Sequence, residues 1–359
     1  MSSPSQTAAE GQPETVPKPS IKFIARDPRA KLDLRIQVFA QEFLVHSDVL
    51  KANSAFFRTF LDSPEKTPAP PSAPFRYEYV SVEDSDGTWG LEVAGKNSGQ
   101  TKTSTEVKVK GAAKQRDSLV KFVKKRQEII AFERLLCAIY HKPYILNVWS
   151  ELERVVRLAD FYCAVPAVSD SMDGVLFRSP MLIDMISDKC EEILKMAHKL
   201  HHPALFREAL VHVVSGRPGC SSNFDDVPDL VRVITDAQVR LNLKRTQVLK
   251  ETFWAARLDK SINEKVFAAL REWNDPSLDW SASVCRNIQT TWPPTFFGGQ
   301  DDRPSVALKE LLANNLALTR YGSEGSVVIE AGVGTYKDKF LCTSIEDHEL
   351  PWNSAAGDW

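Results

Sequence analysis

Hydrophobic and polar positions alternate twice between residues 33 and 61 and then change to a helical spacing. Residues 34–38 alternate apolar and polar side chains, which predicts a half-buried strand. Residues 43–45 alternate again after a short turn, so the pattern predicts a two-stranded hairpin. Ser47 stands where a helix N-cap is expected, and apolar residues at helical spacing follow it. The stretch therefore predicts two strands that lead into a helical hairpin.

A third strand and a basic insertion are expected next. Residues 75–82 alternate in the same way and follow a proline-dense loop that must end the preceding helix. Residues 84–128 are interpreted as a polar, basic insertion. Within it, the alternating residues 89–93 and 107–109 either form a hairpin that extends the third strand or belong to a partly disordered insertion. The lysine-rich segment 121–126 is typical of a localisation signal or a phosphate contact, but a solvated insertion is favoured because no aromatic stacking pattern accompanies it.

The rest of the chain has helical periodicity. Helices are predicted at 129–140, 150–162, 168–177, 182–200, 205–214, 225–254, 262–273 and 307–318. Within the long helix, apolar residues from 227 to 248 have heptad-like spacing. Packing inside a helical bundle is favoured over a coiled coil, because the repeat covers only about three heptads.

Composition narrows the class of protein. The chain has 359 residues, of which 43% are hydrophobic, and a net charge of −2, which is typical of a globular protein long enough for two domains. A near-neutral charge argues against binding of nucleic acid by the whole protein, because such proteins usually carry a basic surface. The sequence start has no signal-peptide pattern, and no apolar run reaches transmembrane length. Six scattered cysteines favour reduced thiols in an intracellular protein, cytoplasmic or nuclear.

An ordered set of residues in the first half carries a family resemblance. The set is Asp33, Val38, Phe43, His46, Leu50, Ser54, Phe57, Phe60, Leu136, Tyr140, Ala159 and Tyr162. It resembles the BTB (POZ) domain family, whose pattern F-x-x-H-x-x-x-L is followed by S-x-x-F and a further Phe. The arrangement with a long helical C-terminal region looks most like fungal BTB-domain proteins.

The resemblance implies an α+β fold, in which a small β-sheet capped by helices is followed by a mainly α-helical C-terminal domain. The expected organisation is a disordered tail at 1–20, the BTB-like domain at 21–178, the helical domain at 179–320 and an irregular tail at 321–359.

The resemblance also implies a non-enzymatic function in protein–protein interaction. Residues 21–24 are interpreted as either a strand or an arm that leads into the first hairpin. BTB domains typically self-associate, so a homodimer is expected, in which Ile21, Phe23 and Ile24 form an apolar arm that contacts the partner. Many members present substrates to cullin-3 ubiquitin ligases, and these adaptors often carry an apolar-x-acidic motif just after the second helix. Residues 60–62 match the residue types of this motif but lie slightly before the position at which the family carries it. The alternative is a nuclear, transcription-linked protein that uses its basic insertion for nucleic acid or import.

No catalytic residue, cofactor or metal is expected, although three groups of residues are candidates. His198, His201 and His202 lie at spacings that a metal site could use, but a solvated helix end is favoured. Cys137 and His141 have the spacing of a thiolate–imidazole pair, but Cys137 lies among apolar residues and is interpreted as a packing residue. His46, at the junction of a strand and a helix, is interpreted as satisfying buried backbone groups.

Overall fold

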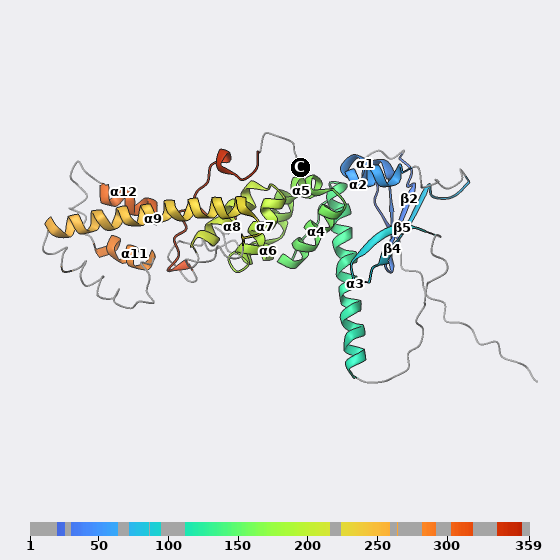
Figure 1. The fold of residues 1–359 in the computed structure, drawn as a ribbon, viewed down its shortest axis with the longest axis horizontal. Coiled ribbons are helices and arrows are strands. Elements are labelled where there is room, and N and C mark those ends of the chain that lie inside the picture. The colour runs from blue at the N-terminus through green and yellow to red at the C-terminus, as the bar shows by residue number, and fades with distance from the viewer. Residues whose placement is uncertain are drawn as a thin grey trace, which may run out of the picture. The chain divides into compact units, whose positions relative to one another are not determined.

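The chain is a mixed α+β protein (Figure 1). The computed structural model describes residues 20–25, 30–63, 72–85, 87–94, 112–215, 224–258, 264, 282–291, 303–318 and 336–353. The chain divides into two compact units, Met1–Leu136 and Cys137–Trp359. All the described strands lie in the first unit. The unit boundary falls within a helix at 136/137, whereas the sequence predicts a domain boundary at 178/179.

A five-stranded sheet with the order β1-β3-β2-β4-β5 forms the centre of the first unit. The strands are β1 (Ile21–Lys22), β2 (Leu34–Val38), β3 (Gln41–Val45), β4 (Tyr77–Glu83) and β5 (Trp89–Val93). β2 and β3 form the predicted antiparallel hairpin, β4 lies parallel to β2, and β5 returns antiparallel to β4. Residues 89–93 are therefore a strand that extends the third strand, while residues 107–109, the other half of the expected hairpin, lie outside the described residues. β1 confirms the strand alternative for residues 21–22 and adds a parallel edge beside β3.

A helical hairpin connects β3 to β4. Its helices are α1 (Ser47–Asn53) and α2 (Ala55–Leu61), and they pack against each other. β4 can lie parallel to β2 because the chain crosses back through these two helices before it re-enters the sheet. The predicted order of two strands, two helices and a third strand is confirmed.

Aromatic rings fill the space between the sheet and α3 (Ala112–Ile139). Phe132 of α3 lies between Phe43 and Trp89, with ring centroids 5.5 Å and 5.9 Å away. The indole Nε1–H of Trp89 donates to Oε2 of the buried Glu128 over 2.9 Å. The interpretation of 84–128 as a polar insertion is therefore wrong at both ends, because strand β5 and the α3 turn around Glu128 are parts of the core. Residues 95–111 lie outside the described residues.

The described residues of the second unit are mainly helical. The helices are α4 (Trp149–Phe161), α5 (Val165–Arg178), α6 (Pro180–Asp184), α7 (Cys190–Lys199), α8 (Pro203–Ser215), α9 (Pro228–Leu258), α11 (Ala282–Thr291) and α12 (Arg303–Leu311). The helix predicted at 182–200 is in fact two helices, separated by a turn at 185–189. α9 packs against α8 and α12, so its apolar spacing serves a helical bundle. Most of the helix predicted at 262–273 lies outside the described residues.

The segment 336–353 is irregular, as predicted, but it is not a tail. It contains the short 3-10 helix η5 (Asp347–Glu349) and is otherwise mostly without regular structure, yet Leu341 and Leu350 are buried. Arg207 of α8 pairs with Asp347, and Arg240 of α9 pairs with Glu349. The segment lacks alternating or helical periodicity because it is held by these individual contacts rather than by regular backbone pairing.

Candidate interaction surface

Asp33, the first residue of the BTB-like set, fixes the start of α1. Its carboxylate accepts hydrogen bonds from the backbone N–H and the hydroxyl of Ser47, over 2.8 Å and 2.6 Å. Its backbone oxygen accepts from the N–H groups of Arg76 and Tyr77, where β4 begins. The sequence predicts Ser47 as the N-cap of this helix, but Ser47 is the first residue of α1. The N-cap is His46, whose side chain makes no capping bond. The cap is supplied by a residue from before the hairpin.

Ser54 has the same function for α2. Its Oγ accepts the backbone N–H of Phe57 over 3.0 Å, which makes it the N-cap. Phe57 itself is buried, as are Leu50 and His46. The spacing S-x-x-F thus combines a cap with the first core residue of the helix that it begins.

The remaining members of the set are also mainly core residues. The buried ones are Val38, Phe43, Leu136, Ala159 and Tyr162, and the half-buried ones are Phe60 and Tyr140. The set therefore maintains the fold, and a surface for partners has to be sought elsewhere.

The apolar arm has a different place from the one expected. Phe23 is buried, with its ring 6.4 Å from that of Phe43, and its backbone N–H donates to the oxygen of Leu44. Ile21 is half-buried in β1. The expectation that the arm has no place in the core of its own chain is wrong for Phe23, because β1 pairs with β3 and brings that ring over the sheet. Ile24 alone of the three is exposed.

An exposed apolar face lies on the N-terminal half of α3. We call it the α3 face; it consists of Leu119, Val120, Phe122 and Val123, which are 62%, 65%, 59% and 45% exposed. Nine residues separate Val123 from the core residue Phe132, which corresponds to about 180° around a helix axis. The α3 face therefore points away from the aromatic core. The interpretation of this segment as a solvated insertion rested on its lysines, although the spacing i, i+1, i+3, i+4 of its apolar residues indicates an apolar face.

Lysine side chains beside the α3 face are partly used within the unit. Lys125 pairs with Glu83 over 2.8 Å, and its Nζ lies 5.2 Å from the centre of the Phe39 ring. Lys121 is exposed. A lysine committed to an acidic partner contributes less to phosphate binding, so this part of the basic segment is weak support for a nucleic-acid surface.

The α1–α2 hairpin presents a smaller aromatic surface. The half-buried rings of Phe56 and Phe60 stack at 4.8 Å, and Phe60 also contacts the ring of Tyr79 at the same separation. In the apolar-x-acidic letters at 60–62, Leu61 is buried and Asp62 forms an ion pair with Lys51. The acidic group of that motif is thus already partnered inside the chain.

The histidines near the end of α7 are packed rather than solvated. The ring of His201 stacks on Trp352 at 5.2 Å and 6°, and the ring of His198 meets the same indole edge-on. His202 is buried, and its Nε2 lies 3.1 Å from the carboxylate of Asp173. Burial is the main cause that lowers the pKa of all three imidazoles. The favoured interpretation, a solvated helix end, is therefore wrong.

No metal site or thiolate pair forms among the described residues. Groups of three or more His, Cys, Asp or Glu side chains that could hold a metal ion are absent from that part of the chain. Cys137 is buried, whereas His141 is exposed and has φ 51°, just after α3 ends. His46 is buried at the strand–helix junction, and its backbone oxygen accepts the N–H of Leu50.

The fold and these surfaces define a mixed α+β protein in which several helices, α3 among them, carry exposed apolar side chains. No family model matches the chain, and no curated protein and no solved structure matches it either. Within the described residues, no helix combines the length and the apolar character needed to span a membrane.

Proposed function

We propose that this protein is a non-enzymatic interaction protein, in which a BTB-like module self-associates and recruits other proteins. The observation that carries the proposal is the connection of β3 to β4. There, two capped helices cross between strands, and β4 lies parallel to β2. The residues that hold this connection, Asp33 and Ser54, belong to the set by which the sequence resembles the BTB family.

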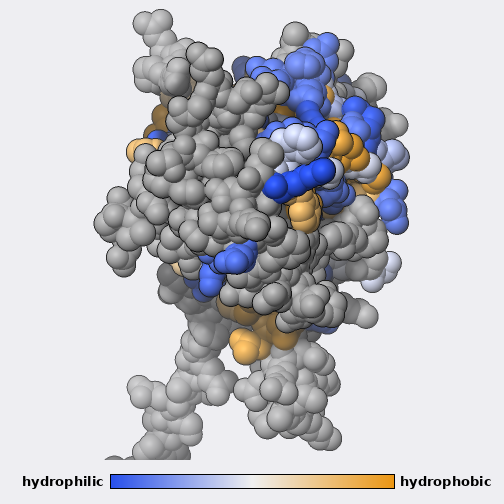
Figure 2. Space-filling model, turned by 90° about the vertical axis from the view of Figure 1, so that its left-hand side faces the viewer, coloured by the Kyte–Doolittle hydropathy of each residue, from blue (hydrophilic) through white to orange (hydrophobic). Residues whose placement is uncertain are grey.

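The α3 face is the surface that we assign to self-association. Four apolar side chains, each at least 45% exposed, stand together in the N-terminal half of α3, a helix whose C-terminal half, from Glu128 on, is packed in the core. Burying such a face against its symmetric copy removes apolar area from water on both subunits. Among the described residues of the first unit, Ile24 is the one other exposed large apolar side chain, and it stands apart from the α3 face. In the second unit α9 also exposes Val239, Leu243 and Trp254, but that helix lies outside the BTB-like module. On the one face that Figure 2 shows, the coloured hydrophobic residues form small groups, several of them beside hydrophilic residues.

Sedimentation equilibrium of the full chain at micromolar concentration tests this assignment. The wild-type chain should be a dimer or larger, and Phe122→Glu should release the monomer while leaving the melting temperature unchanged. Leu243→Glu is the matched control, because Leu243 is an apolar side chain of α9 that is 64% exposed and lies outside the α3 face. A monomeric wild-type chain contradicts the proposal.

Ile24→Glu separates the α3 face from the arm that the sequence resemblance implicates. Ile24 is 64% exposed, so its replacement leaves the packed ring of Phe23 in place. If Ile24→Glu dissociates the dimer and Phe122→Glu does not, the arm is the contact and the assignment to the α3 face is wrong.

Cullin-3 recruitment is not included in the proposal. The motif that would support it is the apolar-x-acidic sequence near α2, and here Leu61 is buried while Asp62 pairs with Lys51. The nuclear alternative depends on the basic insertion, of which residues 95–111 lie outside the described residues.

A further inference from the structure

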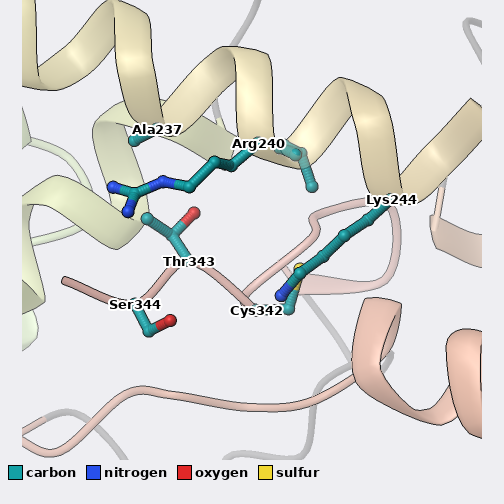
Figure 3. Close-up of a pocket in the computed structure, with 7 residues that line it drawn as sticks. Ala237, Arg240, Lys244, Cys342, Thr343 and Ser344 are labelled. Atoms are coloured by element: carbon teal, nitrogen blue, oxygen red, sulfur yellow. The ribbon is translucent and has the colours of Figure 1, made fainter. Parts of the chain in front are cut away.

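A small hollow lies between α9 and the C-terminal segment in the second unit (Figure 3). It is lined by Ala237, Arg240, Leu241, Lys244, Cys342, Thr343 and Ser344, and its volume is about 40 Å³. A single bound water needs about 10–15 Å³ measured in this way, so the hollow has room for a group of a few heavy atoms.

Two cations reach the hollow from one helix. Arg240 and Lys244 are one helical turn apart on α9, and both side chains extend toward the segment that carries Thr343 (Figure 3). None of the seven lining residues is acidic. Arg240 also pairs with Glu349, which offsets part of its charge but occupies only some of the five N–H donors of a guanidinium. Burial raises the pKa of the Cys342 thiol, and the positive charge of Lys244 opposes that rise. The charge of Lys244 therefore acts inside the hollow.

A buried hydroxyl in the hollow has no partner within the described part of the chain. Thr343 is 7% exposed, and its Oγ1 makes no hydrogen bond there. In Figure 3 this oxygen faces α9, between the side chains of Arg240 and Lys244. Its position is fixed by the backbone, since Nδ2 of Asn315 donates to the oxygen of Thr343 and the N–H of Asn315 donates to the oxygen of Leu341. Buried hydroxyls are normally hydrogen-bonded, so this one indicates a missing acceptor.

We propose that the hollow is a binding site for a small oxyanion of the phosphate or sulfate class. Arg240 and Lys244 supply the positive charge, and the hydroxyl of Thr343 donates a hydrogen bond to one anion oxygen. The hydroxyl of Ser344 lines the same hollow and is a second available donor. The volume of the small hollow itself has room for one tetrahedral group.

A neighbouring hollow offers space for the organic part of a larger molecule whose phosphate occupies the small hollow. It has a volume of about 460 Å³ and shares Arg240 with the first. Its lining includes Arg232, Asp236 and His348. A phosphate monoester could place its phosphate beside Lys244 and its organic part in this larger space. Inorganic phosphate would use the small hollow alone.

Calorimetric titration of the full chain at constant ionic strength tests the site. Inorganic phosphate, inorganic sulfate and glycerol phosphate are the probes, and saturable binding with a dissociation constant on the order of 1 mM is expected. Tighter binding of glycerol phosphate identifies a monoester site, whereas equal binding of all three identifies a site for the free ion.

Three substitutions make the result specific to these residues. Lys244→Gln and Thr343→Val should each weaken binding by about tenfold or more, and Thr343→Ser should preserve it. Lys250→Gln is the matched control, because it removes the same charge from an exposed position on the same helix and should leave binding unchanged. Binding that is absent in the wild-type chain, or equal in Lys244→Gln and Lys250→Gln, overturns the proposal and indicates bound water only.

Discussion

Single residues in this protein stabilise elements that they do not belong to. Asp33 is 14 positions before Ser47, yet its carboxylate supplies the cap of α1 and its backbone oxygen receives the first N–H groups of β4. Asp33 therefore stabilises the N-terminus of α1 through its side chain and the start of β4 through its backbone oxygen. This explains why an acidic residue stands first in the set that resembles the BTB family.

Asp33→Ala should lower the free energy of unfolding by about 1–2 kcal/mol, because the N–H and the hydroxyl of Ser47 lose their acceptor. Urea denaturation of the full chain measures the change. Asp48→Ala is the control: Asp48 is exposed in the first turn of α1 and should cost only a few tenths of a kcal/mol. Equal losses in the two variants would show that the contact between Asp33 and Ser47 contributes nothing.

At the scale of elements, the link between β5 and α3 was not evident from the sequence. Trp89 and Glu128 are 39 positions apart and stand at the two ends of a polar segment. The strand pattern around Trp89 is only five residues long, so it was equally compatible with a loop. Pairing with β4 decides the matter, because it places Trp89 and Leu91 on the buried side of the sheet.

Trp89→Phe should destabilise the chain by about 1–3 kcal/mol, since the buried carboxylate of Glu128 loses the indole N–H donor. Adding Glu128→Leu to that variant should recover part of the loss, because replacing both polar partners by apolar groups removes the desolvation penalty. The measurement is a double-mutant cycle in urea. Additive effects of the two substitutions would mean that the hydrogen bond is not a coupled pair.

At the scale of the whole molecule, buried histidines make stability depend on pH. His212 is buried beside Tyr336, neither ring nitrogen has a hydrogen-bond partner among the described residues, and burial lowers its pKa to about 4. Glu208 opposes this shift and Lys339 adds to it. Burial also lowers the pKa of His198, as it does for the neighbouring histidines.

The folded chain should therefore lose stability as the pH falls from 6.5 toward 4. In this window the unfolded chain binds protons that the folded chain does not, and His212 alone accounts for a change on the order of 3 kcal/mol. Above pH 6.5 the histidine contribution should be flat. Melting temperatures across this range measure it, and His212→Leu should flatten the slope. A wild-type slope that survives in that variant would assign the effect to other groups.

The sequence alone determined the elements whose pattern is set by near neighbours. The strand at 34–38, the hairpin, the helices at 205–214 and 225–254 and the bundle packing of α9 all follow from periodicity, because side chains two or four residues apart must share a face. The burial of Phe57 also follows from the helical spacing of the apolar residues around it.

Only the tertiary structure decided the contacts between distant residues. These include the cap that Asp33 gives to Ser47, the place of Phe23 over β3, and the ion pair of Arg240 with Glu349 across 109 positions. No local pattern encodes such a contact, because it depends on which surfaces the topology brings together.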